Sequence, residues 1–328
     1  MNPHLVCRAC GAGGPFSQHS VREMNFGSEE PFLYLECVNC GSLQIRAVPS
    51  DLSRHYPPDY LGSDHSSDPA SADTLRKAIR DFVKRQRTAY LLRARTPIGW
   101  AAHKRYRDDF APHLVALRPI NLRKKDRILD VGCGPGYLLH RLRRNGYEHL
   151  TGQDPFQKWT VPDIRVHRGR LEDLLGQFDL IMLHHSLEHT PDPLQLLIDL
   201  KKLSAPGGSL LVRIPLAASE AWMQYDVNWY QIDAPRHLVI PSRKGMDILV
   251  QRAGFEVLRV KYDSDETQFL CSEQYRRGVS LRDPRSYYKN PRQMMFNRAE
   301  IAAAKARSRK VNRRERGDQA CFYLRVVS

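Results

Sequence analysis

Hydrophobic residues follow two alternating patterns between residues 127 and 262. Short apolar runs predict buried strands, and the stretches between them have apolar residues at three- and four-residue steps, which predicts amphipathic helices. The predicted strands are Arg127–Asp130, His149–Asp154, Ile164–His167, Phe178–Leu183, Ser209–Ile214 and Phe255–Tyr262. The predicted helices are Tyr137–Asn145, Asp192–Leu203 and Lys244–Ala253, with a turn at Pro206–Gly208. This alternation predicts an α/β fold with a doubly wound, mostly parallel sheet.

Further elements are predicted on both sides of this region. Helical patterns cover Asp73–Arg95 and Ala101–Leu117, and Ala320–Val327 predicts a strand. The first helix has a basic face that suits nucleic acid or an anionic membrane surface, or is simply a solvated face. The stretch 263–319 is longer than a hairpin needs and contains a basic helical pattern over Arg298–Arg316. We expect this insertion to form a cap on the substrate side.

A glycine-rich segment follows the predicted strand at 127–130. Leu129–Gly136 reads Leu-Asp-Val-Gly-Cys-Gly-Pro-Gly, so a carboxylate precedes the first glycine by two residues. Glycine permits positive φ and close approach of a ligand to the backbone. The spacing differs from the G-x-G-x-x-G of dinucleotide binders, and the carboxylate favours a cationic ligand over a pyrophosphate. S-adenosylmethionine is such a ligand, because it carries a sulfonium and an ammonium group and no phosphate.

A second carboxylate, Asp154, ends the next predicted strand, where it would accept the ribose hydroxyls of a nucleoside. The alternative is a tight turn in another kind of α/β enzyme. The predicted cofactor-binding residues are Asp130, Gly132, Gly134, Gly136, Asp154 and His184.

Three side chains suited to acid–base chemistry follow the strand Phe178–Leu183. His185, Glu188 and His189 would lie at its carboxyl end, where open α/β sheets bind their ligands. Transfer of the methyl group of S-adenosylmethionine requires that the acceptor be positioned in line with the sulfonium. A hydroxyl or carbon acceptor also needs a base, and histidine is suited to that role. The alternative is that Glu188 and His189 only shape the loop.

A loop after Ser209–Ile214 is expected to face the same edge of the sheet. It contains His237 and the aromatic residues Trp222, Trp229 and Tyr230, which we expect to line a small-molecule pocket. His237 could equally be a structural hydrogen-bonding residue. The predicted catalytic residues are His185, Glu188, His189, Tyr230 and His237.

Four of the seven cysteines form two C-x-x-C pairs, each followed by glycine. Cys7, Cys10, Cys37 and Cys40 therefore predict a tetrahedral structural zinc site around which a short segment can fold. Disulfides and a redox dithiol are the alternatives; a reducing compartment disfavours the first, and the second lacks a surrounding βαβ pattern.

The net charge of +15 bears on partners rather than on the fold. It points to nucleic acid, an anionic membrane surface or phosphorylated small molecules. No apolar run reaches the length of a membrane span, and Met1–Val6 lacks the order of a signal peptide, so we expect a cytoplasmic protein.

With the glycine segment and Asp154, the chain resembles the class I S-adenosylmethionine-dependent methyltransferases. That resemblance implies a Rossmann-like doubly wound sheet with the last strand antiparallel. Residues His185–His189, Pro235–Leu238, Gly317–Leu324 and Tyr56–Tyr60 resemble a branch found with sugar and polysaccharide modification, whose members carry an N-terminal zinc-knuckle segment.

The stretch His185–His189 is also similar to magnesium-dependent O-methyltransferases of quinone synthesis and of small-RNA ends. Those enzymes have glutamate where this chain has His185, so magnesium is disfavoured. His185, Glu188, His189 and His237 would suit a zinc- or iron-type ion better.

The predicted organisation is a zinc-knuckle segment at 1–50, a linker with basic helices at 51–118 and a methyltransferase domain at 119–328 with an insertion at about 263–319. The leading functional hypothesis is methyl transfer to a small-molecule acceptor such as a sugar, nucleotide sugar or glycan-linked group. An RNA methyltransferase and a non-catalytic cofactor-binding scaffold are the alternatives.

Overall fold

The computed structural model describes residues 5–56, 74–93, 96–106, 110–157, 160–161, 163–290 and 295–327. Residues 57–73 of the predicted linker region, and with them most of Tyr56–Tyr60, lie outside these residues. Contacts within the chain define two compact units. One unit comprises residues 1–55, 185–201 and 212–328, and the other comprises 56–184 and 202–211.

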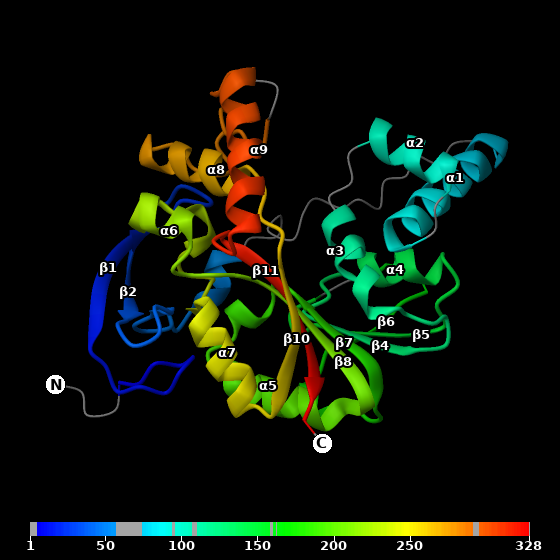
Figure 1. The fold of residues 1–328 in the computed structure, drawn as a ribbon, viewed down its shortest axis with the longest axis horizontal. Helices are drawn as coiled ribbons and strands as arrows, with labels where there is room; N and C mark the ends of the chain where they lie inside the picture. The colour runs from blue at the N-terminus through cyan, green and yellow to red at the C-terminus, as the bar shows by residue number, and fades with distance from the viewer. Residues whose placement is uncertain are drawn as a thin grey trace. The chain divides into compact units, whose positions relative to one another are not determined.

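One seven-stranded sheet has the order β10-β11-β8-β7-β4-β5-β6 (Figure 1). Its strands are β4 (Arg127–Val131), β5 (His149–Gln153), β6 (Arg165–His167), β7 (Phe178–His184), β8 (Ser204–Pro215), β10 (Phe255–Tyr262) and β11 (Gln319–Val326). β4 is parallel to both β5 and β7, and β5 is parallel to β6. β10 and β11 are antiparallel. The predicted doubly wound sheet with an antiparallel last strand is therefore confirmed.

The helices predicted between the strands are present as α4 (Tyr137–Arg143), α5 (Pro193–Leu203) and α7 (Arg243–Arg252). In α4, Leu138, Leu139 and Leu142 are buried, as their spacing on one helical face predicts. The turn predicted at Pro206–Gly208 is wrong, because β8 already begins at Ser204. Gly207 lies within this strand and has a positive φ of 72°.

The single helix predicted over Ala101–Leu117 is also wrong. The described residues there form α2 (Pro97–Arg105) and α3 (Ala111–Ala116), while α1 (Thr74–Leu92) precedes them as predicted. α2 begins at the cap Thr96, whose hydroxyl accepts a hydrogen bond from the Gly99 amide. Pro112 lies in the first turn of α3, where proline is tolerated because no helical N–H is needed there. Proline thus marks a new helix start that the apolar spacing alone did not reveal.

The N-terminal segment forms part of a second, four-stranded sheet that was not predicted. Its order is β1-β2-β3-β9, with β1 (Phe16–Arg22), β2 (Pro31–Cys37), β3 (Leu43–Ile45) and β9 (Val239–Ile240). Leu43 pairs with Ile240 across the β3–β9 ladder, so residues far apart in the sequence share one sheet.

The insertion before β11 contributes helices to a hydrophobic core. α8 (Thr267–Arg276), which was not predicted, and α9 (Arg298–Arg313) lie beside α6 (Glu220–Tyr225) in Figure 1. Trp222 and Trp229 are buried in the same core, and the indole Nε1 of Trp229 donates to Asp318 at 3.0 Å. The expectation that these tryptophans line a pocket is therefore wrong, because their apolar surface packs against the insertion.

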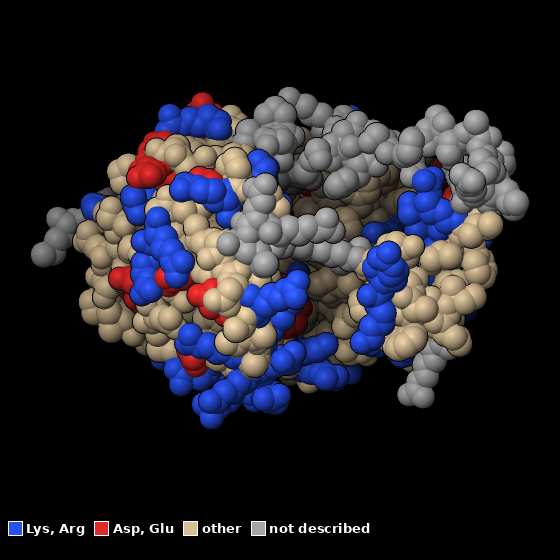
Figure 2. Space-filling model, turned by 90° about the horizontal axis from the view of Figure 1, so that it is seen from above, with Lys and Arg blue, Asp and Glu red and all other residues tan. Residues whose placement is uncertain are grey.

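Lysine and arginine side chains gather on the face shown in Figure 2. Among the described residues, some arginines have acidic partners, such as Arg307 with Glu220 at 3.0 Å and Arg276 with Glu273 at 2.7 Å. Within the described residues, no helix is long and apolar enough to cross a membrane.

A buried arginine connects the N-terminal segment to the loop before β9. Arg236 is 0% exposed, and its guanidinium donates to Glu23 at 2.7 Å, to Asp233 at 2.7 Å and to the carbonyl oxygen of His55 at 3.1 Å. Burial opposes ionisation of Asp233, but the Arg236 charge outweighs it and holds the pKa of that carboxyl well below its usual range. The three ionised groups therefore depend on one another.

Replacing Arg236 with methionine is expected to lower the free energy of unfolding by about 3–5 kcal/mol, because Glu23 and Asp233 would remain buried without a cation. Urea denaturation of the purified protein measures this change. The matched control is Arg325→Met, which removes an exposed pair with Glu256 and should cost less than about 1 kcal/mol. Equal effects of the two substitutions would contradict the structural role of Arg236.

Candidate active site and metal centres

The glycine segment forms a turn between β4 and α4. Gly132, Gly134 and Gly136 all have positive φ, at 72°, 53° and 88°. A Cβ added to Gly134 would meet open space within 4 Å, whereas one on Gly136 would lie 2.9 Å from Cγ2 of Ile164. Gly136 therefore permits local packing, and Gly134 leaves backbone accessible to a ligand.

Asp154 follows β5 and is hydrogen-bonded to the glycine turn. One carboxylate oxygen, Oδ2, accepts from the Gly134 amide at 3.0 Å, and the other accepts from the Phe156 amide at 3.0 Å. Asp154 is only 8% exposed. Its position is thus set by backbone donors, and each oxygen keeps a lone pair for a further donor such as a ribose hydroxyl.

Asp130 lies in β4 and is 4% exposed. Burial, with the nearby charge of Asp154, raises the pKa of Asp130 to about 8. Among the described residues, no donor reaches the Asp130 carboxylate. A cation would offset the cost of ionising this group. Asp130, Asp154 and the open space at Gly134 therefore fit S-adenosylmethionine, whose two positive charges and ribose need these features.

His184, the last residue of β7, packs against His113 of α3 with ring centroids 4.8 Å apart. Its assignment to cofactor binding stays a prediction.

In the other unit, the predicted catalytic residues that follow β7 meet His237. Glu188 belongs to the short helix η4 (Leu187–His189) and is 0% exposed. Its Oε1 lies 3.3 Å from Nδ1 of His185 and 3.9 Å from Nε2 of His237. Ligand atoms of Glu188, His189 and His237 all lie within 4.8 Å of one another. We call Glu188, His189 and His237 the histidine–glutamate group.

Both histidines of the group are oriented by backbone carbonyls. Nδ1 of His189 lies 3.0 Å from the Arg236 carbonyl oxygen, and Nδ1 of His237 lies 2.7 Å from the Gln231 carbonyl oxygen. Since a carbonyl only accepts, each Nδ1 carries the proton and each Nε2 keeps a lone pair in the neutral ring. Burial, with the nearby His237, lowers the pKa of His189 to about 4, so its ring is neutral at pH 7.

His185 is oriented differently, by the buried Arg213 of β8. Nη1 of Arg213 donates to Nε2 of His185 at 2.8 Å, and Nε of Arg213 donates to Asp263 at 2.8 Å. An arginine cannot accept, so the His185 proton resides on Nδ1, facing Glu188. Burial alone would raise the pKa of Glu188, but His185 and the other histidines outweigh it and lower that pKa.

Arg213 was not singled out from the sequence. The sequence did contain a signal for this residue, because Arg213 is a charged residue within the otherwise apolar run Leu210–Ile214. Tyr230, a predicted catalytic residue, instead donates or accepts a hydrogen bond with Thr267 of α8 at 3.0 Å. Burial raises the pKa of Tyr230 well above the usual value, and its catalytic role stays a prediction.

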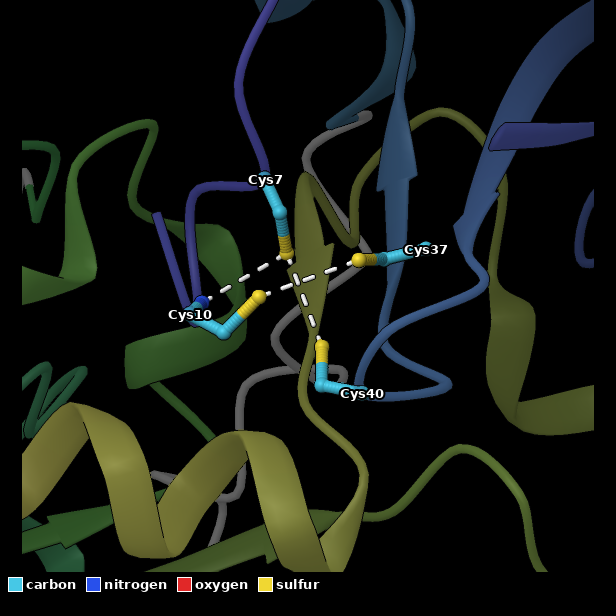
Figure 3. A group of neighbouring side chains, drawn as sticks. All are labelled: Cys7, Cys10, Cys37 and Cys40. Atoms are coloured by element: carbon cyan, nitrogen blue, oxygen red, sulfur yellow. Dashed lines mark hydrogen bonds between the residues drawn. The ribbon is translucent and has the colours of Figure 1, made fainter. Parts of the chain in front are cut away.

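The four predicted zinc ligands converge from two turns, as Figure 3 shows. Sγ of Cys7 lies 3.6 Å from Sγ of Cys40, and Sγ of Cys10 lies 3.7 Å from Sγ of Cys37. A zinc–sulfur bond of about 2.3 Å gives a tetrahedron with an edge of about 3.8 Å. The sulfur spacing therefore fits zinc, and the Cys7 sulfur also faces the Cys10 amide at 3.5 Å.

Comparison with known proteins assigns the class of this domain. Residues 102–260 match a family model described as a methyltransferase domain. With the strand order and the glycine turn after β4, this match identifies a class I S-adenosylmethionine-dependent methyltransferase domain in the chain.

The chain is similar to the tRNA U34 carboxymethyltransferase of Pseudoalteromonas translucida, with 30% identity over 173 residues that cover 47% of this chain and 50% of the relative. It is 33% identical over 98 residues to the ubiquinone biosynthesis O-methyltransferase of Psychrobacter cryohalolentis, covering 25% of this chain and 38% of that protein. The chain spans about half the length of the tRNA-modifying relatives it matches. Among solved structures, the cyclopropane synthase MmaA2 from Mycobacterium tuberculosis aligns over 66% of this chain and 86% of its own length, at 17% identity and a TM-score of 0.42.

Substituting Cys37 with serine is expected to abolish tetrathiolate metal binding, because three thiolates no longer close the site. In the cobalt-substituted protein, the thiolate-to-cobalt charge-transfer absorption should be lost and the melting temperature should fall. Cys133→Ser is the matched control, since Cys133 lies in the glycine segment outside this group. An unchanged absorption in Cys37→Ser would contradict the site.

Cofactor binding is expected to release a proton near neutral pH. Asp130 is mostly protonated at pH 7 when its pKa is about 8, and a bound cation favours its ionised form. Affinity for S-adenosylmethionine should therefore rise with pH up to about 8 and then level off. Titration calorimetry in buffers of different ionisation enthalpy measures the released proton. An Asp130→Asn variant should bind more weakly and without this proton release; the same release in the variant would refute the assignment.

Proposed function

We propose that this chain transfers a methyl group from S-adenosylmethionine to a phosphate-bearing sugar, nucleotide sugar or glycan-linked acceptor. The observation that carries the methyl transfer is the paired arrangement of Asp130 and Asp154 around the glycine turn. When bound, S-adenosylmethionine supplies a methyl group already activated on a sulfonium sulfur.

On the cofactor side, we assign the charge recognition to Asp130 and the ribose contact to Asp154. Asp154 is preorganised by the Gly134 and Phe156 amides, so little reorganisation accompanies binding. Gly132 and Gly136 shape the turn through their positive φ. His184, at the end of β7, completes the proposed cofactor set.

On the acceptor side, we assign roles to the residues that directly follow β7. The acceptor atom loses a proton as the new bond to the methyl carbon forms, and that proton must have a destination. Glu188 supplies negative charge, and the Nε2 atoms of His189 and His237 supply neutral nitrogen lone pairs for this purpose. We assign His185 the role of stabilising the Glu188 carboxylate, because its own Nε2 already accepts from Arg213. Tyr230 is better placed to support α8 through Thr267 than to act on the acceptor.

The sugar acceptor rests on the resemblance of the cysteine segment and of Pro235–Leu238 to the sugar-modifying branch. The positive charge of +15 supports an acceptor that carries phosphate. The charge supports RNA equally well, and relatives of this chain are named for tRNA. A tRNA acceptor is therefore our second candidate.

The test offers the purified protein S-adenosylmethionine labelled in the methyl group, with nucleotide sugars in one arm and total tRNA in the other. We expect label in the nucleotide-sugar arm and none with an Asp154→Asn variant, while the surface control Asp173→Asn remains active. Label in tRNA alone would replace the sugar acceptor with RNA. No cofactor binding by the folded protein would refute methyl transfer.

Two measurements sharpen the distinction between acceptors. Binding of RNA through many phosphates weakens steeply with salt, whereas binding of a nucleotide sugar with few phosphates changes little. The mass gained by the product separates a methyl from a carboxymethyl group, the group named for the tRNA-modifying relatives. A carboxymethyl product would contradict S-adenosylmethionine as the donor.

A further inference from the structure

The histidine–glutamate group is distinct from the cysteine site, and it contains a carboxylate that lacks good partners. Glu188 is 0% exposed, and among the described residues neither of its oxygens accepts a hydrogen bond of good geometry. The 3.3 Å contact to Nδ1 of His185 is close enough for an ionic attraction but is too poorly aligned to count as a hydrogen bond. A buried carboxylate in this state is costly unless a cation compensates it.

The hydrogen bonds of the two histidines indicate which cation is suited. His189 and His237 each donate Nδ1–H to a backbone carbonyl, at 3.0 Å and 2.7 Å. This is the arrangement in which metal-binding histidines are commonly oriented, with the second nitrogen left for the metal. In His237 that nitrogen, Nε2, lies 3.9 Å from Oε1 of Glu188, which leaves room for an ion between them.

We propose that Glu188, His189 and His237 bind a divalent transition metal ion of the zinc or iron type. Two imidazole nitrogens and one carboxylate form a known ligand set for both ions and leave coordination positions open for water or a substrate oxygen. The ligand atoms of the three residues lie within 4.8 Å of one another, close enough for one ion to contact all three.

His185 is a positioning residue and not a ligand in this arrangement. Arg213 donates to Nε2 of His185 at 2.8 Å, which leaves the proton on Nδ1, and a protonated nitrogen cannot bind a metal. The Nδ1–H faces Glu188 and stabilises its negative charge. The structure thus separates four residues that look equivalent in the sequence into three ligands and one supporting donor.

Asp233 is the nearest competing acid, since its Oδ2 also lies 3.9 Å from Nε2 of His237. Its carboxylate, however, accepts hydrogen bonds from the Arg236 guanidinium and from Asn25. Its charge is therefore already compensated by a guanidinium, whereas the described groups that face the Glu188 carboxylate are imidazoles.

Metal binding by this group does not depend on the proposed methyl transfer. One consequence does rest on that function: an acceptor hydroxyl bound at an open position of the ion would lose its proton more readily. The ion would then activate the acceptor in place of the imidazoles, and solvent water would take the proton.

The test measures metal content directly in the full chain after incubation with Zn²⁺, Fe²⁺ or Co²⁺ and removal of free metal. We expect about two ions per chain in the wild type, because the cysteine site holds one. Glu188→Gln and His237→Ala should each retain about one, and Cys37→Ser should lose the other. The control Glu220→Gln removes an acid that pairs with Arg307 and should keep both ions.

Two readouts separate loss of the site from loss of folding. Retention of the thiolate-bound cobalt in Glu188→Gln and His237→Ala shows that the unit is folded, because the cysteine site belongs to the same unit. His185→Gln should keep the second ion at saturation with about 10- to 100-fold weaker affinity, as expected for a supporting donor.

Failure of this inference and failure of the proposed function give different results. Only one ion per chain in the wild type with all three metals would overturn the metal site, and so would a second ion that persists in both Glu188→Gln and His237→Ala. Either outcome leaves cofactor binding at Asp130 and Asp154 untouched. Conversely, absence of cofactor binding would leave the ion count unchanged.

Discussion

The buried guanidinium of Arg236 is the interaction on which much of its unit depends. This guanidinium compensates the negative charges of Glu23 and Asp233, and it donates a hydrogen bond to the carbonyl oxygen of His55. Residues of the N-terminal segment and of the loop before β9 therefore share one cation. The backbone carbonyl of the same residue accepts from His189. One arginine therefore both anchors the N-terminal segment and orients an imidazole of the histidine–glutamate group.

The two buried carboxylates Asp130 and Glu188 differ in pKa and in the cation that they suit, because different groups surround them. Asp130 has a second acid nearby, and burial with that charge raises its pKa to about 8. Burial would also raise the pKa of Glu188, but the surrounding histidines lower it. The first group is suited to a cationic organic cofactor. The second has nitrogen ligands at hand and is suited to a metal ion.

Local patterns were sufficient where the chain alternates regularly. The apolar runs before Asp130 and Asp154 correctly predicted β4 and β5, and the spacing of the leucines correctly predicted α4. These patterns are sufficient because the buried positions of a regular strand or helix recur along the sequence with a fixed period. The N-terminal sheet and α8 were missed, since β9 is only two residues long and pairs with a strand far away in the sequence. The split between α2 and α3 depended on capping by Thr96 and on Pro112 rather than on apolar spacing.

The sequence by itself determined the class of fold, the glycine turn with its two acids and the four cysteines, because each depends on residue type and short spacing. Only the tertiary structure decided the roles of the histidines. The protons of His185, His189 and His237 are positioned by Arg213, by the Arg236 carbonyl and by the Gln231 carbonyl. Two of these partners lie far from their histidine in the chain, so short-range spacing carries no information about them. Burial of Trp229 against the insertion likewise depends on packing between distant segments.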